Sequence, residues 1–269
     1  MKRIFFCCFL LLLLPSFVLA QTKMEELGLK GPVKEIREHY LARTIIYRFS
    51  INQICTERTT EYSYPPEFNF QEPTETIFYD SNERVIKFLS NDNLVSSSEY
   101  DDVALTFITQ TDDSKKQTGT LDAHGNIISR SSIEKTSTRE IFYSYDSKNN
   151  LIKVTTKTNN SPAFFGGYKL EPIRTTKNKY DDKNQITYSE FSSISTTNEN
   201  VILSNQTKFY NDNLLIRSEM FLLEPNKAFT TLYEYPEIDI FGNWTKRLEY
   251  SSTQEKPEIT TRQITYYED

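Results

Sequence analysis

The stretch IFYSYDSKNNL, residues 141–151, carries the pattern from which the expected fold follows. From Ile141 to Tyr145 every second residue is apolar or aromatic, which is typical of a strand with one buried face. Asp146 can accept a hydrogen bond from the backbone N–H two residues further on and so start a turn. Asn149 belongs to the residue types that tolerate a positive φ angle. The stretch therefore predicts a β-hairpin.

The same pattern recurs along the chain: an aromatic or apolar residue, Asp or Asn, three turn-like residues, a polar residue and an apolar residue. The copies are Tyr79–Val85, Leu121–Ile127, Tyr145–Leu151, Tyr180–Ile186, Tyr210–Ile216 and Ile238–Trp244, with Tyr100-Asp101 as a degenerate copy. The residues expected to form the turns are Asp80, Asp122, Gly125, Asp146, Asp181, Asp239 and Gly242. Repeated hairpins predict an all-β protein, an antiparallel meander of stacked β-hairpins in a twisted open sheet or a partial barrel.

The composition agrees with a folded, strand-rich chain. Aromatic residues make up 13% of the sequence, with 17 Tyr and 18 Phe, whereas Gly numbers only 7. Aromatic side chains suit a pleated, half-buried surface, and their apolar area argues against disorder. Residues 60–73 and 157–172 are irregular, but the hairpin pattern resumes after each of them. We therefore expect a single domain over residues 21–269.

Residues 1–20 are expected to form a helical signal peptide that is removed on export. Lys2 and Arg3 precede an apolar run, Ile4–Leu14, which is shorter than the roughly 20 residues that a membrane-spanning helix needs. The residue after the expected cleavage site is Gln21 rather than a cysteine, which argues against lipid attachment. The mature chain is therefore predicted to be periplasmic or secreted, without insertion into a membrane.

Charge and rare residue types exclude several classes of function. The net charge of the full sequence is −6. Residues 1–20 contain two basic residues and no acidic one, so the mature chain has a net charge of −8. Nucleic acid is excluded as a partner, because phosphate binding needs a basic surface. Cys55 is the only cysteine of the mature chain and is expected to be a small buried apolar residue. With two histidines, His39 and His124, no zinc site of usual spacing can be composed, and no metal or cofactor is expected.

The repeat resembles the YD repeat of Rhs-type and teneurin-type proteins. The opening LKGPVK, residues 29–34, and the closing FGNWTKR, residues 241–247, are similar to small exported YD-repeat-like proteins of Bacteroidetes. The resemblance covers residues 29–269 and implies an architecture rather than an activity. In large relatives such repeats form a shell of spiralling hairpins, and this chain is expected to be too short to enclose anything.

One aromatic stretch is a candidate ligand-binding site. Phe164, Phe165 and Tyr168 surround two glycines in an irregular region, and adjacent aromatic side chains cannot all point to one side of a strand. Because long loops often carry function, we consider a binding role for these residues. The alternative is that the loop folds back over the core.

Trp244 is the only tryptophan of the chain. By alternation it is expected to share a strand face with Leu248 and Tyr250 and to anchor the C-terminal hairpin in the core. The alternative is an exposed ring that stacks on a sugar.

No motif indicates catalysis: the chain has neither a G-x-S-x-G element nor a Gly-rich phosphate loop. We therefore expect a binding or structural module of the cell envelope or periplasm that is not an enzyme. The sequence identifies no partner, and a glycan and an envelope protein are the candidates. Two alternatives stay open: a glycan-active enzyme that uses two carboxylates and an intermolecular scaffold.

Overall fold

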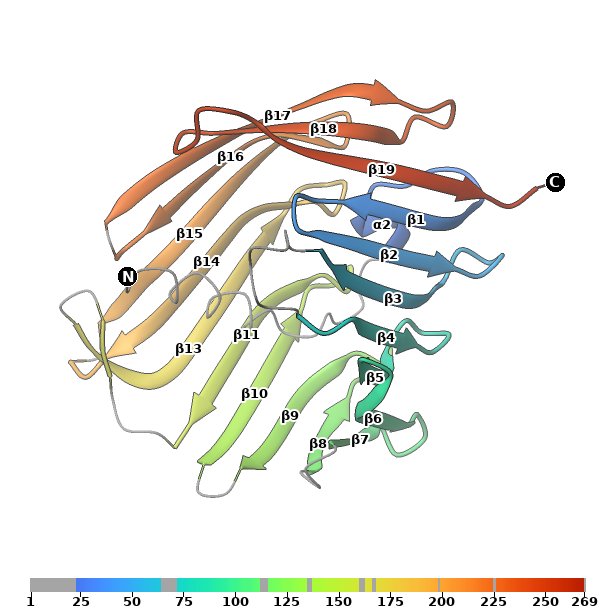
Figure 1. The fold of residues 1–269 in the computed structure, drawn as a ribbon. Coiled ribbons are helices and arrows are strands. Elements are labelled where there is room, and N and C mark those ends of the chain that lie inside the picture. The colour runs from blue at the N-terminus through green and yellow to red at the C-terminus, as the bar shows by residue number, and fades with distance from the viewer. Residues whose placement is uncertain are drawn as a thin grey trace.

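The computed structural model describes residues 23–63, 72–111, 116–134, 137–159, 163–165, 168–197, 199–224 and 226–268. The predicted signal peptide lies outside these ranges. Within them the chain forms a short helix, α2 (Lys23–Glu26), and nineteen strands (Figure 1). None of the helical segments in the described part of the chain is long and apolar enough to cross a membrane.

The strands, in chain order, are β1 (Val33–His39), β2 (Arg43–Phe49), β3 (Cys55–Tyr62), β4 (Glu75–Tyr79), β5 (Val85–Ser90), β6 (Asn93–Asp101), β7 (Thr106–Thr111), β8 (Lys116–Leu121), β9 (Ile127–Glu134), β10 (Ser137–Tyr145), β11 (Leu151–Thr158), β12 (Ala163–Phe165), β13 (Tyr168–Tyr180), β14 (Ile186–Ser195), β15 (Asn200–Asn211), β16 (Leu214–Leu222), β17 (Lys227–Ile238), β18 (Trp244–Ser251) and β19 (Glu258–Tyr266).

These strands form one antiparallel sheet that closes on itself. Neighbours in sequence pair along the whole chain, except that β11 pairs with β13, and the last strand, β19, pairs with β1. In this closing pair Ile36 lies opposite Ile264, and Glu38 lies opposite Arg262. The result is a closed barrel of 18 strands.

The prediction of an open sheet or a partial barrel is wrong. The hairpin pattern indicates which strands are neighbours, and the all-β, antiparallel part of the prediction agrees with the structure. Closure depends on the twist and coiling that accumulate over all the strand pairs. The alternation of apolar and polar residues along a strand does not indicate these angles. Closure also pairs the backbone groups of β1 and β19, which would otherwise be open edges.

The sequence predicted an irregular loop over residues 157–172, whereas most of the described residues in this range belong to β11, β12 and β13. β12 pairs with the start of β13, where Ala163 lies opposite Leu170. The later part of β13 pairs with β11, where Thr176 lies opposite Val154. β12 therefore extends the wall beyond the end of β11 and is the strand that does not belong to the ring.

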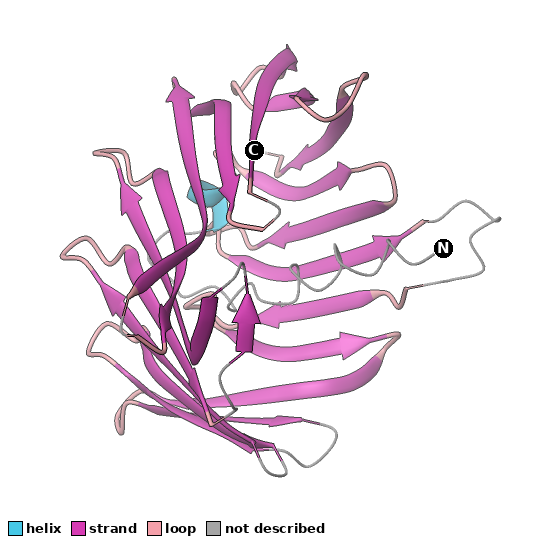
Figure 2. Cartoon of the chain, turned by 90° about the vertical axis from the view of Figure 1, so that its left-hand side faces the viewer, coloured by secondary structure: helices cyan, strands magenta, loops and turns pink. Residues whose placement is uncertain are grey.

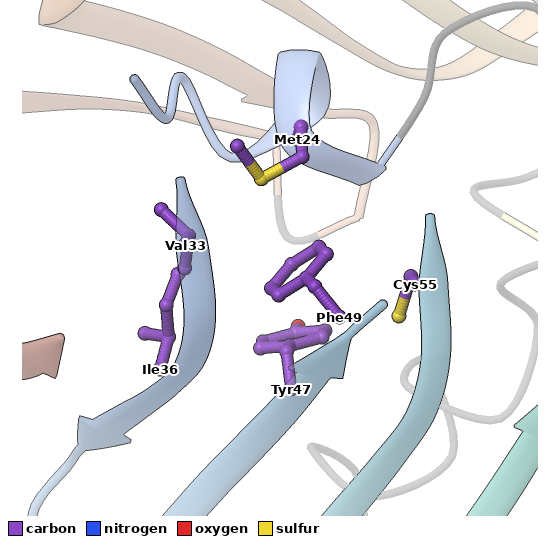
Figure 3. Close-up of a cluster of buried hydrophobic side chains, with 6 residues drawn as sticks. All are labelled: Met24, Val33, Ile36, Tyr47, Phe49 and Cys55. Carbon is purple, nitrogen blue, oxygen red and sulfur yellow. The ribbon is translucent and has the colours of Figure 1, made fainter. Parts of the chain in front are cut away.

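The register divides the side chains between an inner and an outer face. Ile36 and Tyr47 lie opposite each other on one face, and both belong to a buried cluster that also contains Met24 of α2 (Figure 3). On β15, burial lowers the pKa of Lys208 and the Glu26 carboxylate of α2 partly raises it again. The helix thus lies between opposite walls, inside the barrel (Figures 1 and 2). The chain does enclose a segment of itself, contrary to the expectation from its length.

Three separate apolar clusters contain most of the buried hydrophobic side chains that the structure describes. The first contains Met24, Val33, Ile36, Tyr47, Phe49 and Cys55. The second contains Phe107, Leu121, Ile127, Ile141, Tyr143 and Val154. The third contains Leu170, Val201 and Leu203. Gly119 is required in the second cluster, because a Cβ atom there would lie 2.2 Å from the Phe107 ring.

Candidate functional site

The turns of the repeat gather at one end of the barrel, which we call the Asp rim. At Asp146 one carboxylate oxygen, Oδ1, accepts backbone N–H groups from Lys148 and Asn150, both at 2.8 Å. The other oxygen accepts the Asn150 side-chain amide at 3.1 Å, and Asn149 has a φ of 64°. The same pair of backbone hydrogen bonds occurs at Asp80, Asp122, Asp181 and Asp239. These carboxylates are acceptors within their own turns.

A turn of similar geometry, between β2 and β3, lacks the aspartate of the predicted pattern. Ser50 occupies the aspartate position, and its Oγ accepts the N–H of Ile54 at 3.3 Å. Gln53 has the positive φ, 62°. The spacing from Phe49 to Cys55 equals that of the other copies, so a search that accepted Ser in place of Asp would have found this turn.

Several tyrosines that precede a turn of the Asp rim have a specific partner that the sequence did not reveal. The Tyr145 hydroxyl donates to the backbone carbonyl of Ile127, at 2.9 Å, in the first residue after the preceding turn. Equivalent bonds run from Tyr100 to Val85, from Tyr180 to Leu151, from Tyr210 to Ile186 and from Tyr235 to Leu215. In these five cases the hydroxyl links a hairpin to the one before it, which a phenylalanine could not do.

The two end motifs of the sequence are in contact with each other. The backbone N–H of Lys30 donates to Asn243 Oδ1 at 2.8 Å, and Asn243 Nδ2 donates to the Lys30 carbonyl at 2.9 Å. The Phe241 ring lies so close to Gly31 that a Cβ atom there would be 2.8 Å from it. The motifs thus join the two ends of the chain next to the closing pair of strands.

Trp244 is buried, with 6% of its surface exposed. The guanidinium carbon of Arg262 lies 3.5 Å from the centre of its ring, and the Tyr235 ring lies at 5.8 Å. The expectation that Trp244 shares a face with Leu248 and Tyr250 is wrong, because a register shift separates the Trp244 pair from the rest of the β17–β18 ladder. Tyr250 is on the outer face and 37% exposed.

A buried ion pair lies next to this tryptophan. Arg262 Nε donates to Glu38 Oε1 at 2.6 Å, and the Tyr40 hydroxyl donates to the second oxygen of Glu38 at 2.8 Å. Burial lowers the pKa of Arg262, and the Glu38 carboxylate opposes this shift. A second inward carboxylate, Glu249, pairs with Arg247. Both glutamates are therefore engaged by arginines.

The predicted ligand-binding stretch forms a hairpin. Phe165 of β12 lies opposite Tyr168 of β13, and Tyr168 is exposed. The side chains of Phe164 and Phe165 lie outside what the structure describes. The binding role of these three residues stays a prediction.

Cys55 is buried, and burial, with a further contribution from the Glu83 carboxylate, raises the pKa of its thiol to about 12. A thiol with this pKa has little thiolate at neutral pH and is a poor nucleophile. Among the described residues, no group of three or more His, Cys, Asp or Glu side chains is placed to hold a metal ion.

The outer wall has a hollow of about 440 Å³ across β7, β8, β9 and β10. Its lining includes Ile108 and Phe142 at opposite sides and short hydroxyl side chains between them. Ile108 lies opposite Thr118, Thr118 opposite Ser131, and Ser131 opposite Glu140, so these residues form a row across four strands. The row lies on the face opposite the Phe107 cluster. We call this hollow the outer groove.

No family model matches the sequence, and no curated protein matches it. Several solved structures are similar to the chain. A porin-like protein from Bacteroides uniformis matches with a TM-score of 0.51 and 14% sequence identity, over 88% of this chain and 99% of that one. A porin-like protein from Bacteroides vulgatus matches with a TM-score of 0.44 and 7% identity, over 87% of this chain and 98% of that one.

The Photorhabdus luminescens Tc holotoxin pore matches with a TM-score of 0.39 and 15% identity, over 82% of this chain and 12% of that one. The last two similarities are too loose to support an inference, and the first concerns the fold alone. The chain is thus similar in fold to a porin-like protein, and its resemblance to YD-repeat proteins rests on its sequence motifs.

Proposed function

We propose that the protein is an exported binding or structural module of the cell envelope, and that water surrounds its barrel. The proposal rests on the charged side chains of the outer face. Charged side chains stand along the strands on this face, including the ion pair of Lys177 and Glu190, at 3.4 Å, and that of Lys246 and Glu237, at 3.2 Å. Lys177 lies opposite Glu190 and follows Thr176, which pairs with the buried Val154. Lys246 lies opposite Glu237 and also opposite Thr261, which stands between two buried residues of β19. Both pairs therefore point outward.

A lipid-facing barrel wall has the opposite character. Its outward residues form an apolar band, and one Lys or Arg at the middle of the bilayer costs about 2–4 kcal/mol. On β13, Lys177 and Lys179 are two residues apart and therefore on one face, and Lys153 of β11 lies opposite Lys177. This concentration of charge favours a barrel in the aqueous part of the envelope over a membrane pore.

The two alternative functions have less support. A carboxylate-dependent glycosidase needs two acids that flank one bond, whereas the inward Glu38 and Glu249 are paired with arginines and the rim aspartates are acceptors in turns. An edge-to-edge scaffold needs a free strand edge, and the barrel joins β1 to β19.

The test is to express the full chain in a bacterial host and to fractionate the envelope. We expect the protein in the osmotic-shock fluid without detergent, with an intact mass that begins at Gln21. Planar bilayers exposed to the purified protein should show no channel conductance. Recovery only from detergent-solubilised outer membrane, or stepwise conductance, would contradict the proposal.

A further inference from the structure

The outer groove combines small side chains in its floor with larger ones at its sides. β8 and β9 contribute Thr118, Thr120, Ser129 and Ser131, whereas β7 contributes Ile108 and β10 contributes Phe142. The contrast in side-chain size between the middle and the flanking strands makes the wall concave at this place. The volume of the groove, about 440 Å³, lies within the range of small-molecule sites, about 300–1,000 Å³.

Several polar groups in this groove have no partner within the described part of the chain. Thr118, Ser131 and Glu140 make no side-chain hydrogen bond with any residue that the structure describes. By contrast, the hydroxyls of Thr120 and Ser129 lie 2.7 Å apart and bond each other. The groove thus offers hydroxyls that can donate and accept, together with a carboxylate that accepts, all on strands whose backbone is already paired.

Each side of the groove has one large, exposed apolar side chain, next to Thr106 on β7 and next to Glu140 on β10. Ile108 is 41% exposed and Phe142 is 42% exposed. Apolar walls over a floor of hydroxyls match a ligand that has both C–H faces and many hydroxyl groups. An aromatic ring packs against such C–H faces without losing hydrogen bonds, and the floor can replace the water that leaves the ligand's hydroxyl groups.

We propose that the outer groove binds a neutral oligosaccharide. The proposal specifies the ligand of the binding module proposed above and rests on that function. Glu140 and Arg130 are the two charged residues of the lining, so the lining has no net charge, which favours an uncharged sugar over an anionic one. A peptide that adds a strand is disfavoured, because that mode of binding needs a free sheet edge and β7 to β10 are paired on both sides.

The experiment measures binding of short malto-, cello-, xylo- and chito-oligosaccharides to the purified mature chain by calorimetry. We expect at least one of these series to bind. Phe142→Ala and Glu140→Gln should each weaken this binding at least tenfold, which corresponds to about 1.4 kcal/mol. Ser131→Phe, which fills the floor from an outward position, should abolish it without lowering the thermal midpoint.

Phe209→Ala is the matched control. Phe209 is also on the outer face, is 40% exposed and has a cation over its ring, Arg217 at 5.3 Å, just as Phe142 has Lys157 at 5.4 Å. It does not line the groove, so its replacement should leave binding unchanged. Absence of binding by every series, equal loss in both Phe variants, or binding of extended peptides alone would overturn the proposal. Fractionation of the envelope is independent of this result, so failure of the sugar site and failure of the envelope function are distinguishable.

Discussion

At the residue scale, Trp244 shows how the interior is stabilised by mixed contacts. Its ring lies against the Arg262 guanidinium and near Tyr235, so it contributes apolar burial together with a cation–π contact. The arginine in turn is fixed by Glu38 and by the carbonyl of Leu27, at 3.2 Å. Loss of the ring would therefore open a cavity beside a buried charge.

We expect Trp244→Ala to lower the free energy of unfolding by about 3–5 kcal/mol, as a buried large-to-small substitution. Urea unfolding followed by circular dichroism measures this loss. Tyr250→Ala, an exposed residue of the same strand, serves as the control and should change stability by less than about 0.5 kcal/mol. Wild-type tryptophan emission near that of the free amino acid, readily quenched by iodide, would refute the buried position.

The rim aspartates predict how stability depends on pH. Burial would raise the pKa of Asp146, but the hydrogen bonds from Asn150 and Lys148 outweigh it and lower the pKa below its usual value. At Asp122, too, burial would raise the pKa, but the hydrogen bonds that its carboxylate accepts outweigh burial and lower the pKa. A folded-state pKa below the unfolded one means that the stabilisation is present at neutral pH and is lost as the pH falls through the folded value.

We therefore expect the urea midpoint to fall in acid, below about pH 4, where unfolded aspartate begins to bind protons. In Asp146→Asn the side-chain oxygen still accepts hydrogen bonds but does not titrate, so this variant should lose less stability between pH 7 and pH 3. Superimposable pH profiles for the variant and the wild type would show that Asp146 makes no contribution.

At the scale of the elements, α2 and the seam between β1 and β19 depend on each other. Arg262 of β19 bonds both Glu38 of β1 and the carbonyl of Leu27, just beyond the helix. Lys23 donates its backbone N–H to Glu83 in the turn between β4 and β5, at 2.9 Å. The helix therefore connects the seam to a distant part of the wall.

Glu38→Gln should lower the free energy of unfolding by about 3–5 kcal/mol, because it leaves the Arg262 charge buried without its counterion. The double variant Glu38→Leu/Arg262→Met, which removes both charges, should recover much of that loss. As a control, Glu237→Gln breaks the exposed pair with Lys246 and should cost no more than about 1 kcal/mol. Additive losses in the double variant would mean that the two charges do not interact.

At the scale of the whole molecule, closure removes every edge from the ring of strands. β1 and β19 are the first and last strands of the chain, and their pairing makes the N-terminal and C-terminal segments mutually dependent. The contact between Lys30 and Asn243 reinforces this junction from the Asp rim. A chain that lacked either end strand would present two open edges.

Removal of the chain from residue 258 onward should therefore convert a monomer into aggregates, because the edges of β18 and β1 are then free to pair with other chains. Size-exclusion chromatography with light scattering distinguishes the two states. Ile259→Thr changes an exposed residue within β19 but keeps the strand, and it should stay at the size of the wild type. A truncated chain that elutes as a folded monomer would show that closure is dispensable.

The sequence by itself determined the local structure of this protein. Alternation around residues such as Ile141 and Tyr143 and the aspartate turns predicted antiparallel hairpins, because both depend on contacts within a few residues. The tertiary structure decided the rest: the closure of the barrel, the register shift that separates Trp244 from the face of Leu248 and Tyr250, the pairing of Glu38 with Arg262 and the alignment of Thr118 with Glu140 in the outer groove. These features depend on accumulated twist, on a register shift and on residues up to 224 positions apart, and no local pattern records such long-range geometry.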